Sequence, residues 1–218
     1  MEISITLILV IITALVSLGG FSNQKVIDDL IFFPPAVTHR NQWYRFLTCG
    51  LIHADYGHLI FNMLALYLFG KGVEEAFVAL TGPSGRYVYL LMYVSALVIS
   101  LLPTYFRNRE NYNYRSLGAS GAVSAVIFAG LMLAPETEVY LFFIPIPIPG
   151  FIFAPLYLLI SAFMDKRGNT GINHSAHIWG AIYGLAFVII MGRAIEYNVV
   201  AVALERIKAY LHIKGWIK

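Results

Sequence analysis

Six runs of mostly apolar residues constrain the fold of this chain more than any other feature of its sequence. A helix needs about 20 such residues to cross the hydrocarbon core of a bilayer. None of the runs shows the period-two alternation of a barrel strand, so helices are the remaining spanning structure. We therefore predict an all-α integral membrane protein, a bundle of six transmembrane helices. The predicted spans are residues 3–20, 58–80, 86–106, 116–134, 150–164 and 174–196.

The composition supports membrane insertion independently of any motif. Of the 218 residues, 59% are hydrophobic and only 12% are charged, and the mean hydropathy is +0.71, which is far more apolar than a soluble domain. The net charge of +3 is small, and no basic run indicates nucleic acid as a partner. A cleaved signal peptide is the alternative for the first run, but the chain opens with Met1-Glu2 instead of a basic segment. We expect one domain over residues 1–218.

The connections between the predicted spans are uneven. Residues 21–57 are apolar and aromatic and include Trp43 and Arg45, which predicts a structured, partly membrane-immersed loop between helices 1 and 2. In residues 142–149 three prolines alternate, which forbids a helix and delays the fifth span until residue 150. Residues 197–218 alternate apolar and basic side chains, which is typical of an amphipathic helix on an anionic leaflet or of a solvated tail.

Polar, chemically capable side chains open the second, fourth and sixth spans. Alternate spans enter the bilayer from the same face, so these side chains share one side of the membrane at a similar shallow depth. A serine is a weak nucleophile unless a base removes its proton, and imidazole is the usual base near neutral pH. The set predicts a hydrolytic site within the membrane, and its members are His58, Asn62, Ser120 and His177.

Ser120 and His177 each have a structural alternative. Ser120 lies in Gly118-Ala119-Ser120-Gly121, where a helix start offers free N–H groups to an oxyanion, but the same small residues are common on packing faces of membrane helices. His177 is followed by Gly180 and Gly184, whose four-residue spacing favours close packing against another helix. The two interpretations are compatible, because close packing is a way to bring His177 to Ser120.

Other roles are open to the remaining polar residues. His58 and Asn62 are four residues apart on one helix face, and both donate hydrogen bonds, which suits an oxyanion better than a metal. His174 is a rival base one turn before His177. A metal site built from His53, His58, His174 and His177 lacks a recognised spacing, so we expect no metal and no cofactor. Asp55 and Asp165 are not compellingly spaced as a third member of a triad.

Taken together and in order, these motifs resemble the rhomboid family of intramembrane serine proteases, in its minimal six-span bacterial form. The resemblance covers nearly the whole chain and is specific because the motifs occur in the family's order. The matching segments are Trp43-Tyr44-Arg45-Phe46-Leu47-Thr48, the H-x-x-x-x-H-x-x-x-N pattern of His53, His58 and Asn62, the G-x-S-G of Gly118–Gly121, and the A-H-x-x-G-x-x-x-G from Ala176 to Gly184.

The resemblance implies a function and a set of roles. Ser120 would be the nucleophile and His177 the general base, without an acidic third residue. His58, the Asn62 amide and the Ser120 backbone N–H would form the oxyanion hole. Substrates would be single-span membrane proteins, and the enzyme a multi-pass protein of the cell inner or plasma membrane. Ser124 departs from the family pattern, since some members carry a tyrosine there that stacks on the histidine.

Two other classes of protein remain as alternatives. A catalytically inactive rhomboid-like protein that binds membrane clients would share the fold but should lack the serine or the histidine. A small transporter would place its polar groups at the membrane midplane between repeats. Within the protease interpretation, the fifth span is the candidate moving element, because it is short, follows the prolines and contains Pro155.

Overall fold

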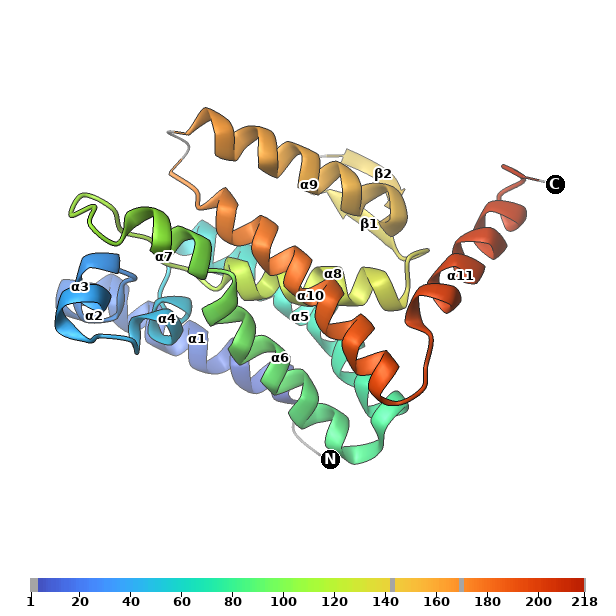
Figure 1. Ribbon diagram of the computed structural model, residues 1–218, viewed down its shortest axis with the longest axis horizontal. Helices are drawn as coiled ribbons and strands as arrows, with labels where there is room; N and C mark the ends of the chain where they lie inside the picture. The colour runs from blue at the N-terminus through green and yellow to red at the C-terminus, as the bar shows by residue number, and fades with distance from the viewer. Residues whose placement is uncertain (1–3, 142–143, 169–170, 218) are drawn as a thin grey trace.

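The computed structural model describes residues 4–141, 144–168 and 171–217. Its central helix, α8 (Ser120–Leu133), contacts α5 (Tyr56–Thr81), α6 (Gly85–Ile99) and α10 (His174–Ala194) directly. In Figure 1, α1 (Ile5–Ser22) lies below α8 and contacts α5, and α9 (Gly150–Arg167) lies above the group, along α10. The protein is therefore a helical bundle arranged around the shortest of its main helices.

The outer surface of the bundle is apolar. One leucine or isoleucine on each of five helices is between 60% and 69% exposed, although these are residues that water-soluble proteins bury: Leu15, Leu68, Leu91, Leu159 and Ile190. Such side chains are stabilised by contact with lipid. The chain is an integral membrane protein.

A helix lies at each of the six predicted spans, but the number that cross the membrane stays a prediction. Among the described residues, three segments are long and apolar enough to cross by length and composition alone: Ile5–Ser22, Tyr56–Asn108 and His174–Ala194. The predicted third span, 86–106, is divided in the structure. Helix α6 ends at Ile99, and a separate helix, α7 (Leu102–Asn108), begins with Pro103 in its first turn, where a missing N–H is tolerated.

The loop between α1 and α5 is structured, as predicted. It contains α2 (Gln24–Leu30), α3 (Pro34–Arg40), α4 (Arg45–Thr48) and the short 3₁₀ helix η1 (Cys49–Leu51). The buried Arg45 guanidinium holds this loop together, since Nη1 donates to the carbonyl oxygens of Asp28 and Ile31 at 3.0 and 2.7 Å. Immersion of the loop in the membrane stays a prediction.

A carboxylate on α5 fixes the start of α1. Glu74 accepts hydrogen bonds from the Ser4 hydroxyl, from the backbone N–H groups of Ile5 and Thr6, and from the Thr6 hydroxyl, at 2.6 to 3.0 Å. The first N–H groups of a helix have no partner within it, so Glu74 acts as a cap supplied by another helix. This contact ties α1 to the bundle at the end of α5 remote from the predicted site.

The segment after α8 is a β-hairpin that the sequence did not predict. Strands β1 (Glu138–Leu141) and β2 (Ile144–Pro149) pair antiparallel, with Val139 opposite Ile148. Residues 142 and 143, the start of the predicted proline-rich segment, lie outside the described residues. Helix α9 begins at Gly150, as the alternating prolines predicted.

The C-terminal segment forms a helix, α11 (Val199–Ile213), that extends away from the bundle in Figure 1. Arg206 forms an ion pair with Glu136, and Lys214 lies 3.3 Å from a Glu138 oxygen, so the helix is attached to the turn and strand that follow α8. Whether this helix lies on a membrane surface stays a prediction.

Candidate active site

Ser120 and His177 are in hydrogen-bond contact. Ser120 is the first residue of α8, and His177 lies in the first turn of α10. The distance between Ser120 Oγ and His177 Nε2 is 2.7 Å. With Nε2 unprotonated, the serine donates its proton along this bond, which is the geometry that general-base activation requires.

Glycines bring the two helices to this distance. A Cβ on Gly180 would overlap the backbone carbonyl of Gly121, and one on Gly184 would overlap the carbonyl of Ala125. The backbones of α8 and α10 therefore touch without side chains between them. The packing face formed by these small residues also brings His177 within hydrogen-bond distance of Ser120.

The turn before α8 exposes Ser120 and its neighbouring N–H groups. Gly118 has φ +110°, a conformation that L side chains rarely adopt, and its N–H donates to the Cys49 carbonyl at 2.9 Å. The first hydrogen bond within the helix runs from Val123 N to Ala119 O at 2.9 Å. The N–H groups of Ser120 and the next two residues precede it and lack helical acceptors, so they are oriented towards the turn. The predicted start at residue 116 was four residues early.

His58 lies against the same turn, because a Cβ on Gly118 would come within 2.7 and 2.8 Å of the His58 Cε1 and Nε2 atoms. The Ala54 N–H donates to His58 Nδ1 at 3.4 Å. In the neutral ring this places the proton on Nε2, which faces Gly118. The His58 ring therefore offers a hydrogen-bond donor beside Gly118, which is two residues before Ser120.

Asn62 lies one turn further along α5 and is buried. Its Nδ2 donates to the His58 backbone carbonyl at 2.9 Å, so in this conformation the amide is hydrogen-bonded within α5. Asn62 lies on the same side of α5 as His58, as the four-residue spacing predicted. Its amide must turn away from that carbonyl to reach an oxyanion.

The rival residues are not joined to Ser120. The His174 ring lies edge-on to that of His177, with ring centroids 5.9 Å apart. Of these two histidines, His177 is the one whose ring is hydrogen-bonded to Ser120. Asp165 forms an ion pair with Arg107 at 3.4 Å, and the Asp55 side chain accepts a hydrogen bond from the backbone N–H of His58 at 2.8 Å. In the part of the chain that the structure describes, neither carboxylate has a hydrogen bond to His177.

Residues 4–141, 144–168 and 171–217 contain no group of three or more His, Cys, Asp or Glu side chains placed to hold a metal ion. The side chains at the site are a serine, an amide and imidazoles. Their arrangement suits proton transfer and stabilisation of an oxyanion.

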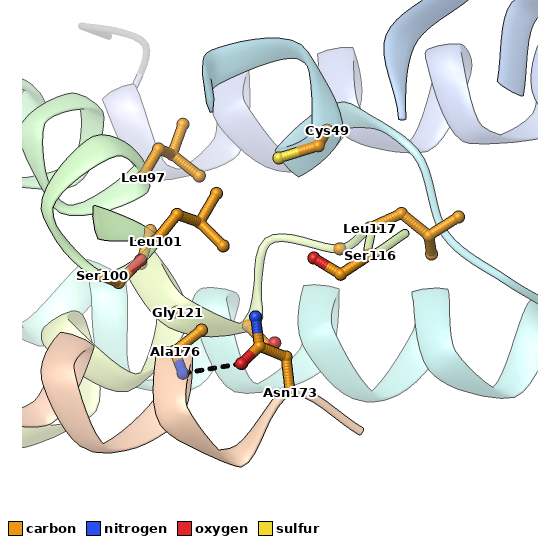
Figure 2. A pocket seen from close by; sticks show the side chains of 12 residues that line it. Cys49, Leu97, Ser100, Leu101, Ser116, Leu117, Gly121, Asn173 and Ala176 are labelled. Atoms are coloured by element: carbon orange, nitrogen blue, oxygen red, sulfur yellow. Dashed lines mark hydrogen bonds between the residues drawn. The ribbon is translucent and has the colours of Figure 1, made fainter. Parts of the chain in front are cut away.

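A small cavity of about 20 Å³ borders Ser120, and Figure 2 shows it from close by. It is lined by both polar and apolar residues of η1, the end of α6 and its junction with α7, the turn before α8, the start of α8 and the start of α10. They are Cys49, Leu97, Ser100, Leu101, Ser116, Leu117, Gly118, Ser120, Gly121, Ala122, Asn173 and Ala176. A cavity of this size has room for about one water molecule.

Sequence reasoning missed two residues near the site. Asn173 caps α10, with Oδ1 accepting from the Ala176 N–H at 3.1 Å, and an asparagine directly before an apolar run is a helix-start signal that could have identified it. Tyr157 of α9 lies 3.3 Å from the hydroxyl of Ser124, and nothing in the sequence indicates this contact. The position that departs from the family pattern is therefore bonded to the helix expected to move.

Fold and site together define a class: a helical integral membrane protein with a serine and a histidine in contact at the starts of two neighbouring helices. Comparison with known proteins identifies the family. The model of the Rhomboid domain matches residues 40–194, and the chain belongs to the rhomboid family.

Individual relatives agree with this assignment. The chain is 27% identical over 182 residues to the rhomboid protease GlpG of Haemophilus influenzae, covering 82% of this chain and 87% of that protein. It is 27% identical over 166 residues to the putative rhomboid protease YdcA of Bacillus subtilis, covering 72% of each chain. It is 30% identical over 145 residues to the mitochondrial RHOMBOID-like protein 12 of Arabidopsis thaliana, covering 62% of this chain and only 42% of that protein.

Proposed function

We propose that this chain is an intramembrane serine endopeptidase that cleaves single-span membrane proteins. The observation that carries the proposal is the 2.7 Å contact between Ser120 Oγ and His177 Nε2. Membership of a family that includes named rhomboid proteases supports it. An inactive client-binding protein would have no need to keep both side chains in this geometry.

In the proposed reaction Ser120 Oγ attacks the carbonyl carbon of the substrate peptide while its proton passes to His177 Nε2. The electron pair of the carbonyl moves to its oxygen and forms a tetrahedral oxyanion. As this intermediate collapses, the peptide C–N bond breaks and the leaving nitrogen takes the proton from His177. A water molecule then attacks the resulting ester, with His177 as base again, and releases Ser120.

The oxyanion would be held by donors of different kinds. The Ser120 N–H would be one donor, and the protonated Nε2 of His58 a second, since the absence of a side chain on Gly118 leaves room for this imidazole of α5 beside the turn. The Asn62 amide becomes the third donor after it leaves the His58 carbonyl. Such donors act strongly at a site with little water because competing solvation is absent.

We assign the substrate class from the position of the site in the bundle. Ser120 and His177 lie near the ends of membrane helices, so a substrate reaches them from within the bilayer or from its surface. A peptide bond is attacked only in an extended segment, and an extended backbone is costly in hydrocarbon. Single-span helices that unwind readily near the membrane surface fit this requirement. We also propose that the protein resides in the cell inner or plasma membrane.

The test is cleavage of a single-span substrate by the purified protein in liposomes. Ser120→Ala and His177→Ala should each abolish cleavage, and the double variant should be no worse than either single variant, because residues that act as a unit are not additive. Circular dichroism and thermal unfolding of each variant control for folding. Turnover that persists in Ser120→Ala would refute the assignment of the nucleophile.

A further inference from the structure

Asn173 connects the start of α10 to α7 through its side-chain oxygen. Oδ1 accepts from the Ala176 N–H at 3.1 Å and from the Thr104 hydroxyl at 3.1 Å. Because the Ala176 N–H is a donor, the orientation of the amide is fixed, with the oxygen towards Ala176. Figure 2 shows this bond and the amide nitrogen turned away from it. His177 follows Ala176 directly.

The segment that carries Thr104 also contacts the first turn of α8, which begins with Ser120. Thr104 is buried in α7, directly after the junction between α6 and α7. At this junction Ser100 packs against α8, because a Cβ on Gly121 would overlap the Ser100 hydroxyl oxygen. The segment from Ser100 to Thr104 is thus packed on the start of α8 and hydrogen-bonded to the cap of α10.

The two helix starts that this segment contacts are the ones that carry Ser120 and His177. Glycine packing sets how closely α8 and α10 approach, but it leaves both helices free to slide along or turn about their axes at contact. A bond to the N-terminal end of α10 restricts such motion, and a displacement near 1 Å is enough to break a hydrogen bond of 2.7 Å.

We infer that Asn173 and Thr104 are positioning residues that hold His177 in register with Ser120. The inference rests on the proposed function for its catalytic consequence. Its structural part concerns only the contact between the imidazole and the hydroxyl, which is measurable without substrate. Neither residue touches the reacting atoms.

The structure offers a matched control for the cap. Asn198 begins α11 in the same way as Asn173 begins α10, with Oδ1 accepting from the Ala201 N–H at 3.1 Å. Helix α11 lies at the far end of the molecule from the start of α10 (Figure 1). Asn173→Ala and Asn198→Ala therefore each remove an asparagine cap, and they differ in what the capped helix carries.

Thr104 allows the relay to be removed while the cap stays. Thr104→Val keeps the side-chain shape and loses the hydroxyl, and Thr104→Ser restores a hydroxyl. In the cleavage assay we expect kcat to fall about 10-fold in Thr104→Val and about 100-fold in Asn173→Ala, because small displacements of a catalytic group have effects of this order. KM should stay within about two-fold, and Thr104→Ser should recover most of kcat. Asn198→Ala should match the parent in kcat.

The direct test is ¹⁵N NMR of histidine-labelled protein, with the His177 resonances assigned by His177→Gln. Ser120→Ala gives the spectrum of the ring without its hydroxyl partner. The His177 signals of Asn173→Ala and Thr104→Val should move towards that spectrum, and those of Asn198→Ala should not. Unchanged His177 signals in both variants, or an equal change in Asn198→Ala, would overturn the inference. Absence of cleavage by the parent protein would refute the proposed function alone, because this spectrum is recorded without substrate.

Discussion

Gly180→Ala should separate α8 from α10 and disable the site. The added Cβ would overlap the Gly121 carbonyl oxygen, and Cβ atoms in proteins essentially never lie closer than 3.0 Å to a neighbouring non-hydrogen atom. Restoring that distance requires the two backbones to part by about 1 Å, since neither is a flexible side chain that can turn aside. Gly180 is less than one helical turn from His177, so the displacement reaches the imidazole almost undiminished.

A shift of about 1 Å would lengthen the 2.7 Å contact between Ser120 and His177 to about 3.7 Å, which is outside hydrogen-bond range. We expect kcat to fall about 100-fold. The overpacked interface should also lower the free energy of unfolding by about 1–3 kcal/mol. The assays are cleavage in liposomes and thermal unfolding in detergent.

Gly72→Ala is the control, because Gly72 is also in a membrane helix and an added Cβ there has nothing within 4 Å. It should leave cleavage unchanged and stability equal or slightly higher, as alanine is the better helix former. Parent-like kcat in a folded Gly180→Ala variant would refute the reasoning that backbone contact sets the distance between the two side chains.

Three further outcomes follow from the structure. Asn62→Ala should reduce the cleavage rate by about 10²–10³ and keep slow turnover, because one oxyanion donor is lost and the nucleophile remains; activity as low as in Ser120→Ala would point to a more central role. Phe153→Ala, which removes a ring packed near Tyr157 of α9, should raise cleavage of a membrane-embedded substrate but not of a small soluble ester, and equal effects on both would exclude α9 as the moving element. Burial, followed by the charge of His58, lowers the pKa of the His53 imidazole to about 3. As the pH falls, His53 is therefore protonated in the unfolded chain before it is protonated in the folded protein, and the free energy of unfolding should decrease from about pH 6.5 towards pH 3. His53→Gln should reduce that loss of stability by about 2 kcal/mol at pH 5, which is checked by comparing the free energies of unfolding at about pH 7 and pH 5 in the parent and the variant.

Much of the helical framework was predictable because lipid imposes a strong and simple pattern on sequence. A long apolar run without period-two alternation satisfies its backbone hydrogen bonds in lipid only as a helix, and each of the six predicted runs contains a helix. The helix boundaries that were predicted wrongly depend on the backbone conformation at single residues. The turn at Gly118 delays α8 until Ser120, and Pro103 begins a new helix instead of continuing α6. The hairpin after α8 does not follow from the alternating prolines, which exclude a helix but do not specify strand pairing.

The members of the candidate site were predictable as a group, because spans that enter from one face place their first turns together. The contacts that support them were not. Asn173 and Thr104 are 69 residues apart in the sequence and meet only when α7 and α10 are packed. The bond between Tyr157 and Ser124 likewise depends on where α9 lies. No periodicity or spacing in the sequence carries information about such pairs.

The most direct test of the central claim is to map the site of reaction with a fluorophosphonate probe. The purified protein is labelled, digested and analysed by mass spectrometry, alongside the Ser120→Ala and His177→Ala variants. The account predicts a single modified serine, Ser120, and no modification in either variant, because the nucleophile is absent in one and its base in the other. A label on a different serine, or a Ser120 that reacts equally without His177, would contradict it.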